Sequence, residues 1–131
     1  MKNLKAIMLI DDNKADNYFH TLILKEAGFS GKILVFQYAE EALAYLTNPQ
    51  NAPVDLIFLD INMPRMDGFE FMQQFVAENF DNQSQVILMM LTTSLSPIDK
   101  ERATGFPQMK GFINKPLTAT LLEEIVQAHF S

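Results

Sequence analysis

Carboxylate side chains directly follow two of the apolar runs in this sequence. Asp11 and Asp12 come after the run at 5–10, and Asp60 comes after the run at 54–59. If both runs are parallel strands, their carboxyl ends lie at one edge of a sheet, and the three carboxylates converge there. Clustered negative charges raise one another's proton affinity unless a cation neutralises them. The arrangement therefore indicates a site for a hard divalent cation.

Mg²⁺ suits this set of ligands. It prefers oxygen ligands in an octahedron and keeps several waters, so one or two carboxylates and a backbone carbonyl suffice. Asp12, Asp60 and the carbonyl of Asn62 meet that need. Helix capping is a simpler use of such residues, and Asp12 or Asn13 could cap a following helix. Capping alone does not call for Asp11, Asp12 and Asp60 together.

Hydroxyl and lysine side chains follow two further apolar runs. Lys115 follows the run at 111–114, and the run at 85–91 is followed by the hydroxyl residues Thr92, Thr93 and Ser94. A lysine among carboxylates can bind one phosphoryl oxygen as a point charge, while a hydroxyl donates to another. Taken alone, Lys115 would be a solvated or ion-paired surface residue. Facing three carboxylates, it indicates phosphoryl chemistry.

Apolar runs alternate with helical patterns five times along the chain. The runs are continuous enough for strands buried on both faces, and they lie at 5–10, 32–36, 54–59, 85–91 and 111–114. This alternation favours right-handed crossovers and an open parallel sheet with helices on both faces. The sheet brings the polar residues at the strand ends together.

Apolar residues at helical spacing predict the helices and their core faces. The first helix should end near Gly28, and a short fourth should span 97–103, where Gly105 and Pro107 interrupt the pattern. A core face is predicted for each of the first, second, third and fifth helices. In that order the faces are Ala15, Tyr18, Phe19, Leu22 and Ile23; Ala39, Ala42, Leu43 and Leu46; Phe69, Met72, Val76 and Phe80; and Leu121, Leu122, Ile125 and Val126.

The composition is typical of one compact, soluble domain. The 131 residues are 48% hydrophobic and 20% charged, and none is cysteine, which excludes disulfides, thiolate zinc sites and a cysteine nucleophile. Ten basic residues against 16 acidic residues give a net charge of −6. The basic residues are scattered along the chain, which disfavours direct nucleic-acid binding. The first apolar run is too short for a membrane span and lacks a cleavage site, so we expect a cytoplasmic protein without a membrane partner.

Four motifs together resemble the receiver domain of two-component response regulators. They are Asp11-Asp12, Asp60 in LIFLDINMPRMDG, Thr92 in MMLTTS and Lys115 in FINKP, and the likeness spans essentially the whole chain. Their order at the strand ends makes the combination specific. The resemblance implies a flavodoxin-like α/β fold, a doubly wound five-stranded parallel sheet of order 2-1-3-4-5 with five helices. We expect residues 1–131 to form a single receiver domain without an output domain.

The resemblance assigns roles to the acidic residues. Asp60 is implied to be the phosphoacceptor, which attacks a phosphohistidine to form an acyl phosphate. Asp12, Asp60 and the carbonyl of Asn62 would bind Mg²⁺, and Asp11 would act near the metal, often through water. Asn62 and Ser94 would flank the water that hydrolyses the acyl phosphate.

The resemblance also implies a conformational switch. Thr92 would donate a hydrogen bond to the phosphoryl group, Lys115 would form an ion pair with it, and the threonine loop would move. Phe112 stands where an aromatic residue changes rotamer with that loop, although an aromatic in a short strand is ordinarily a core residue. A cis peptide bond would join Lys115 and Pro116.

The implied function is signalling rather than enzymatic turnover, with only self-directed phosphotransfer and acyl-phosphate hydrolysis. A sensor histidine kinase or histidine phosphotransfer protein would donate the phosphoryl group, and the output would be a downstream protein target or an onward phosphorelay. A phosphatase of the haloacid-dehalogenase-like fold is disfavoured, because Asn62 replaces its second Asp and no cap segment is present. A phosphate-independent adaptor would not need the full acidic, Thr and Lys set. His20 and His129 have no catalytic neighbours and are interpreted as surface or packing residues.

Overall fold

A five-stranded parallel sheet forms the centre of the computed structural model, which describes residues 1, 3–78, 85–93 and 96–131. The strand order is β2-β1-β3-β4-β5, so the predicted flavodoxin-like topology is confirmed. The strands are β1 (Ala6–Ile10), β2 (Lys32–Phe36), β3 (Leu56–Leu59), β4 (Ile87–Thr92) and β5 (Met109–Asn114). Their ends differ from the predicted runs by at most two residues. Residues of β1 and β3 are buried throughout, whereas the edge strands β2 and β5 are partly exposed.

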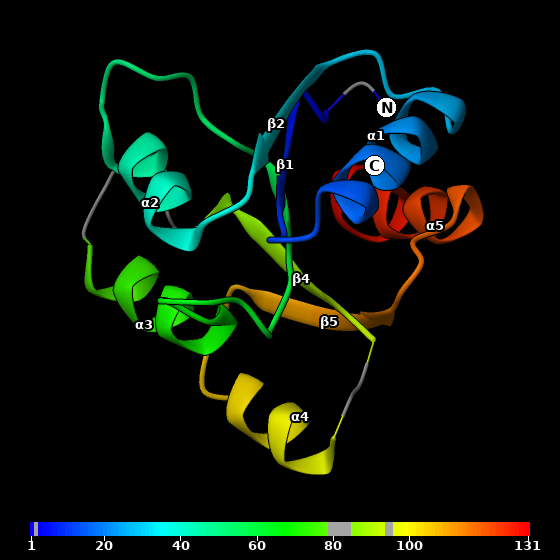
Figure 1. Ribbon diagram of the computed structural model, residues 1–131. Helices are drawn as coiled ribbons and strands as arrows, with labels where there is room; N and C mark the ends of the chain where they lie inside the picture. Colours follow the sequence, from blue (N-terminus) through cyan, green and yellow to red (C-terminus); the bar gives the residue numbers. More distant parts are fainter. Residues whose placement is uncertain (2, 79–84, 94–95) are drawn as a thin grey trace.

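Five α-helices cover the sheet within the described part of the chain. They are α1 (Lys14–Glu26), α2 (Ala39–Thr47), α3 (Gly68–Ala77), α4 (Pro97–Ala103) and α5 (Ala119–Phe130). Figure 1 shows α1 and α5 on one side of the sheet and α2 and α3 on the other. Each side has its own apolar core, with Phe71 and Phe75 of α3 in one and Leu24 of α1 and Leu122 of α5 in the other. None of the described helices is both long and apolar enough to cross a membrane.

Local signals in the sequence explain where the helices begin and end. The side chains of Asn13, Ser96 and Thr118 each accept a hydrogen bond from a backbone N–H in the first turn of the helix that follows. Asp67 caps α3 in a capping box with Glu70. Gly28 follows α1 with a φ of 99°, a left-handed conformation that favours glycine, and the first helix ends close to it as predicted.

The predicted core face of the first helix is wrong except at Ile23, which is half-buried against the core. Ala15 is exposed, and the exposed fractions of Tyr18, Phe19 and Leu22 are 67%, 44% and 46%. The buried residues of α1 are instead Asn17, His20 and Leu24. With 3.6 residues per turn these three share one face, on the side opposite Tyr18 and Leu22. The helix therefore turns two polar side chains, Asn17 and His20, inward together with Leu24.

The core face of α3 is broader than predicted. Phe69 and Met72 are buried as expected, but Val76 is exposed, and Phe80 lies outside the described residues. Phe71 and Phe75, which the apolar spacing did not include, are fully buried. The predicted core faces of α2 and α5 are buried or half-buried, so those predictions are confirmed.

Candidate functional site

Three carboxylates meet at the carboxyl edge of the sheet, as predicted. Asp11, Asp12 and Asp60 each offer an oxygen, and these oxygens all lie within 4.8 Å of one another. Asp11 and Asp60 are buried, whereas Asp12 is exposed. The backbone N–H of Asp60 donates to the carbonyl of Ile10 at 3.0 Å, so the β1–β3 ladder continues into the site and fixes its main chain.

Lys115 brings a positive charge to this cluster from the end of β5. Its Nζ lies 2.6 Å from Asp11 Oδ2, 2.9 Å from Asp16 Oδ2 and 3.6 Å from Asp60 Oδ1. Burial lowers the pKa of Lys115, but its close contacts with the carboxylates of Asp11 and Asp16 outweigh that effect and raise the pKa above its ordinary value. Lys115 is therefore a permanent cation here. The peptide bond between Lys115 and Pro116 is cis.

The carboxylate of Asp60 has a raised proton affinity. Burial, followed by the negative charge of Asp11, raises the pKa of Asp60 to about 6, although the charge of Lys115 opposes the shift. Asp60 is thus mostly ionised at neutral pH while it is largely removed from water. A desolvated carboxylate of this kind is suited to nucleophilic attack.

The donor set at this edge fits Mg²⁺. Its side-chain donors are all carboxylate oxygens, the hard ligands that Mg²⁺ prefers. Asp11 Oδ2 accepts no hydrogen bond of good geometry from the described residues, and its close contact is the ion pair with Lys115. Asp12 and Asn62 are exposed, which leaves one side of the cluster open for the waters that Mg²⁺ keeps.

The inner face of α1 fastens this edge of the sheet through polar contacts. Asn17 Nδ2 donates to the carbonyl of Asp11 at 2.7 Å, and His20 Nε2 accepts a hydrogen bond from the backbone N–H of Leu117 at 3.2 Å. Burial lowers the pKa of His20, which agrees with an unprotonated, accepting Nε2. Buried backbone groups need such partners. The demand for them explains why the first turns of α1 direct Asn17 and His20 inward while Tyr18 and Leu22 stay exposed.

The loop between β3 and α3 packs tightly against the backbone of Asp60. A Cβ atom placed on Gly68 would lie 2.7 Å from the carbonyl oxygen of Asp60 and 3.0 Å from Ile61 Cα. The N–H of Gly68 also donates to the carbonyl of Ile61 at 2.8 Å. Only glycine allows this approach without a shift of the main chain.

The other residues singled out in the sequence lie at or near this edge. Thr92 is fully buried at the end of β4, and its carbonyl accepts a hydrogen bond from the N–H of Lys115 at 2.8 Å. Phe112 is half-buried and packs against the core beneath α2 and α3. Ser94 lies outside the described residues. His20 is a packing residue, whereas His129 is exposed on α5.

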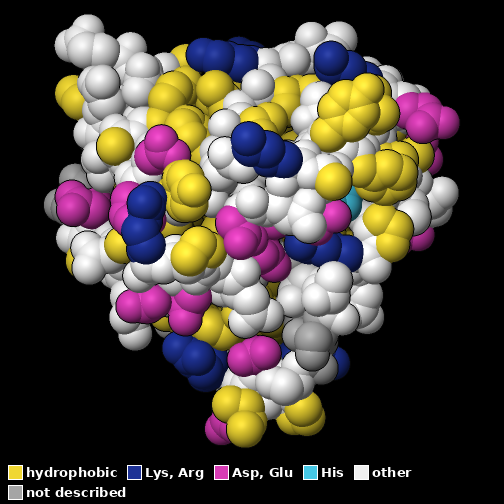
Figure 2. Space-filling view, in the orientation of Figure 1, with side chains coloured by type: hydrophobic (Ala, Val, Ile, Leu, Met, Phe, Trp, Pro, Cys, Tyr) yellow, Lys and Arg dark blue, Asp and Glu magenta, His cyan; other side chains and the backbone are white. Residues whose placement is uncertain are grey.

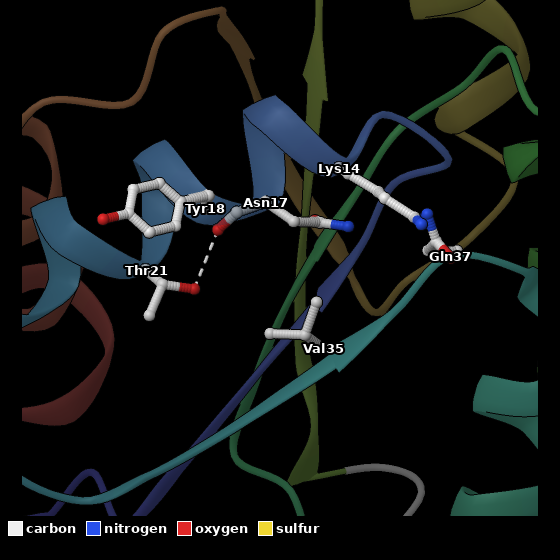
Figure 3. A pocket seen from close by; sticks show the side chains of 6 residues that line it. All are labelled: Lys14, Asn17, Tyr18, Thr21, Val35 and Gln37. Carbon is white, nitrogen blue, oxygen red and sulfur yellow. Dashed lines mark hydrogen bonds between the residues drawn. The ribbon is translucent and has the colours of Figure 1, made fainter.

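An exposed apolar surface lies beside the site on α1. Figure 2 shows hydrophobic side chains gathered over this helix, where Tyr18, Phe19 and Leu22 are exposed. Next to them an open groove runs between α1 and the edge strand β2 (Figure 3). Its lining includes Tyr18 and Thr21 from the helix and Val35 from the strand. Exposed apolar area of this kind marks a surface that other molecules can cover.

Sequence reasoning missed Asp16, although a signal for it was present. Asp16 lies four residues before His20, and Asn17 lies three residues before it, so the three share one helical face. The sequence of α1 therefore offers two candidate inner faces, this polar one and the apolar one with Tyr18 and Leu22. Only the contacts with Lys115 and Leu117, about a hundred residues away, decide between the two.

Comparison with known proteins agrees with this geometry. The profile of the response regulator receiver domain matches residues 7–127. The chain belongs to this family. Receiver domains are signalling modules of two-component systems rather than conventional enzymes. The matched residues include the carboxylate cluster and Lys115.

Individual relatives extend the likeness. The receiver is 31% identical to response regulator Rcp1 from Synechocystis sp. over an alignment of 94 residues. This alignment covers 69% of this chain and 63% of Rcp1. It is 24% identical over 140 residues to hybrid signal transduction histidine kinase B from Dictyostelium discoideum, covering 99% of this chain and 7% of that protein. A two component response regulator from Cytophaga hutchinsonii superposes with a TM-score of 0.83 at 27% identity over 96% of both chains. The receiver thus spans less than two thirds of either curated relative.

Proposed function

We propose that this receiver accepts a phosphoryl group from a phosphohistidine partner onto Asp60 in a Mg²⁺-dependent reaction. The observation that carries the proposal is the surroundings of the Asp60 carboxylate. Oxygens of Asp11 and Asp12 lie within 4.8 Å of an Asp60 oxygen, and the Lys115 ammonium is 3.6 Å from Asp60 Oδ1. Membership of the receiver family supports the same chemistry.

The reaction begins when an Asp60 oxygen attacks the phosphorus of the phosphohistidine. The O–P bond forms as the P–N bond breaks, and the electron pair returns to the histidine ring nitrogen. Asp12, Asp60 and the carbonyl of Asn62 would hold the metal, with Asp11 beside it. When bound, Mg²⁺ screens the negative charge shared by the phosphoryl group and the carboxylates. Asn62 and Ser94 would then flank the water that hydrolyses the acyl phosphate.

Thr92 and Lys115 would detect the transferred group. The Thr92 hydroxyl donates to one phosphoryl oxygen, and the Lys115 ammonium pairs with another. Their backbones are joined by a hydrogen bond at 2.8 Å, so displacement of one is transmitted to the other. Phosphorylation then favours a second surface state in which Phe112 changes its packing.

The phosphoryl donor in this proposal is a sensor histidine kinase or a histidine phosphotransfer protein. The likeness to a region of a hybrid histidine kinase supports a donor of this class. The receiver would act on a downstream protein target or pass its phosphoryl group to a second histidine. Residues 1–131 would serve these steps as one receiver unit, without direct contact with nucleic acid or membrane.

Incubation with a small phosphodonor and Mg²⁺, followed by intact mass spectrometry, tests the proposed nucleophile. We expect the native chain to gain one phosphoryl group and Asp60→Asn to gain none, because the amide is not a nucleophile. Chelation of Mg²⁺ should suppress the gain on the native chain. A native chain that stays unmodified, or an Asp60→Asn variant that gains the same mass, would refute the role of Asp60.

Titration calorimetry with Mg²⁺ tests the proposed metal ligands. Asp12→Asn should weaken Mg²⁺ binding by at least about tenfold, because it removes a charged ligand. Glu124→Gln makes the same change of charge at an exposed position on α5 and should leave the affinity nearly unchanged. Equal affinities in the two variants would place the metal elsewhere.

A further inference from the structure

We propose that Asp16 is a positioning residue that receives the Lys115 ammonium when a divalent cation occupies the carboxylate cluster. The inference rests on the proposed metal site and adds a residue from α1 to it. Asp16 would touch neither the metal nor the phosphoryl group. Its role is to hold the lysine at the rim of the cluster while the metal replaces the lysine on the carboxylates of Asp11 and Asp60.

Lys115 is shared between two kinds of carboxylate. It forms ion pairs with Asp11 and Asp60, whose oxygens belong to the cluster of potential metal ligands. It also pairs with Asp16 at 2.9 Å, and Asp16 lies outside that cluster. The Asp16 contact is a hydrogen bond, whereas the 3.6 Å distance to Asp60 is too long for one. Asp11 and Asp16 therefore hold the Lys115 ammonium more closely than Asp60 does.

A divalent cation and Lys115 compete for the same oxygens. The contact between Nζ and Asp11 Oδ2 is 2.6 Å, so a cation bound at the cluster meets the ammonium at close range. Two positive charges a few Å apart repel strongly where water is largely excluded, and the Lys115 side chain is only 10% exposed. The lysine must move off the cluster but has little access to solvent. Asp16, at the rim with 35% of its side chain exposed, offers an anionic partner already in contact.

Contacts from α1 keep Asp16 in place for this exchange. The next residue, Asn17, bonds to the carbonyl of Asp11, and His20 bonds to the N–H of Leu117, two residues after Lys115. The helix is thereby tied to both segments that carry the competing groups. Asp16 therefore stays within reach of Lys115 during the exchange. Without Asp16, the ammonium would have no carboxylate partner after the metal displaces it from the cluster.

A double-mutant cycle on Mg²⁺ affinity tests the proposal. Titration calorimetry compares the native chain, Asp16→Asn, Lys115→Met and the double variant. We expect Asp16→Asn to weaken Mg²⁺ binding about fivefold in the native background, because the lysine then stays on Asp11 and Asp60. In the Lys115→Met background the same change should alter the affinity by less than about twofold, because no lysine remains to be displaced. Asp16→Glu should restore most of the affinity.

Two outcomes would overturn the role of Asp16. One is an equal loss of affinity in both backgrounds, which would make Asp16 only a general source of negative charge. The other is no loss in the native background. Asp16→Ser, also uncharged, replaces Asp16→Asn if thermal unfolding shows that the latter does not fold. A native chain that binds no Mg²⁺ would instead overturn the metal site of the proposed function, and this inference with it.

Discussion

Asp60→Asn should raise the free energy of unfolding by about 2–3 kcal/mol at neutral pH when Mg²⁺ is chelated. Burial and the charge of Asp11 raise the pKa of Asp60 from 3.8 to about 6 in the folded chain. Keeping this carboxylate ionised therefore destabilises the folded state, and the neutral amide removes that penalty. The substitution that we expect to prevent phosphorylation should thus stabilise the fold.

The size of this gain should depend on pH in a defined direction. Below pH 3.8 the Asp60 carboxyl is protonated in both the folded and unfolded chains, so the variant gains nothing from losing its charge. The gain grows between pH 3.8 and about 6, as the unfolded chain ionises before the folded one, and is constant above. Denaturant titrations across this range in a chelating buffer measure it.

Asp12→Asn is the matched control, because it changes the same charge in the same cluster at an exposed position. Its gain should be smaller, since Asp12 loses less hydration on folding. Saturating Mg²⁺ should reverse the order of stability, because a ligand that binds only the folded chain stabilises the native protein more than the variant. A destabilised Asp60→Asn, or a gain that does not change with pH, would contradict this account.

Leu24→Ala should destabilise the fold by about 2–5 kcal/mol, whereas Leu22→Ala should cost less than about 1 kcal/mol. Both are the same substitution on α1, two residues apart. Leu24 is fully buried in the core beneath α1 and α5, and Leu22 is 46% exposed. Urea unfolding of the two variants measures the difference. Equal losses of stability, or a larger loss for Leu22→Ala, would show that Leu22 faces the core, as the apolar spacing predicted.

Much of the site could be predicted because its residues stand at strand ends. Apolar runs reveal buried parallel strands, and their last residues must then lie at one edge, which located Asp11, Asp60 and Lys115. The topology followed from the same alternation together with the resemblance. Thr92 was found in this way as well, because it ends β4.

The inward face of α1 could not be predicted by the same reasoning. Hydrophobic spacing predicts which face meets an apolar core, but the first turns of α1 meet backbone groups and Lys115 instead. Lys115 and Leu117 lie just after β5, 99 and 97 residues from their partners on α1, so no local window of sequence contains them. Hydrogen bonds of Asn17 and His20 outweighed the burial of Tyr18 and Leu22.

Gly68 shows how a residue without a side chain becomes part of the surroundings of Asp60, the proposed nucleophile. The absent Cβ leaves the space that the Asp60 carbonyl occupies, at 2.7 Å from where that atom would be. Any larger residue would push against the main chain of Asp60, the proposed phosphoacceptor, and move its carboxylate relative to Asp11 and Asp12. In a mutational scan we therefore expect position 68 to tolerate little change, because a side chain there would displace Asp60, eight residues earlier in the chain.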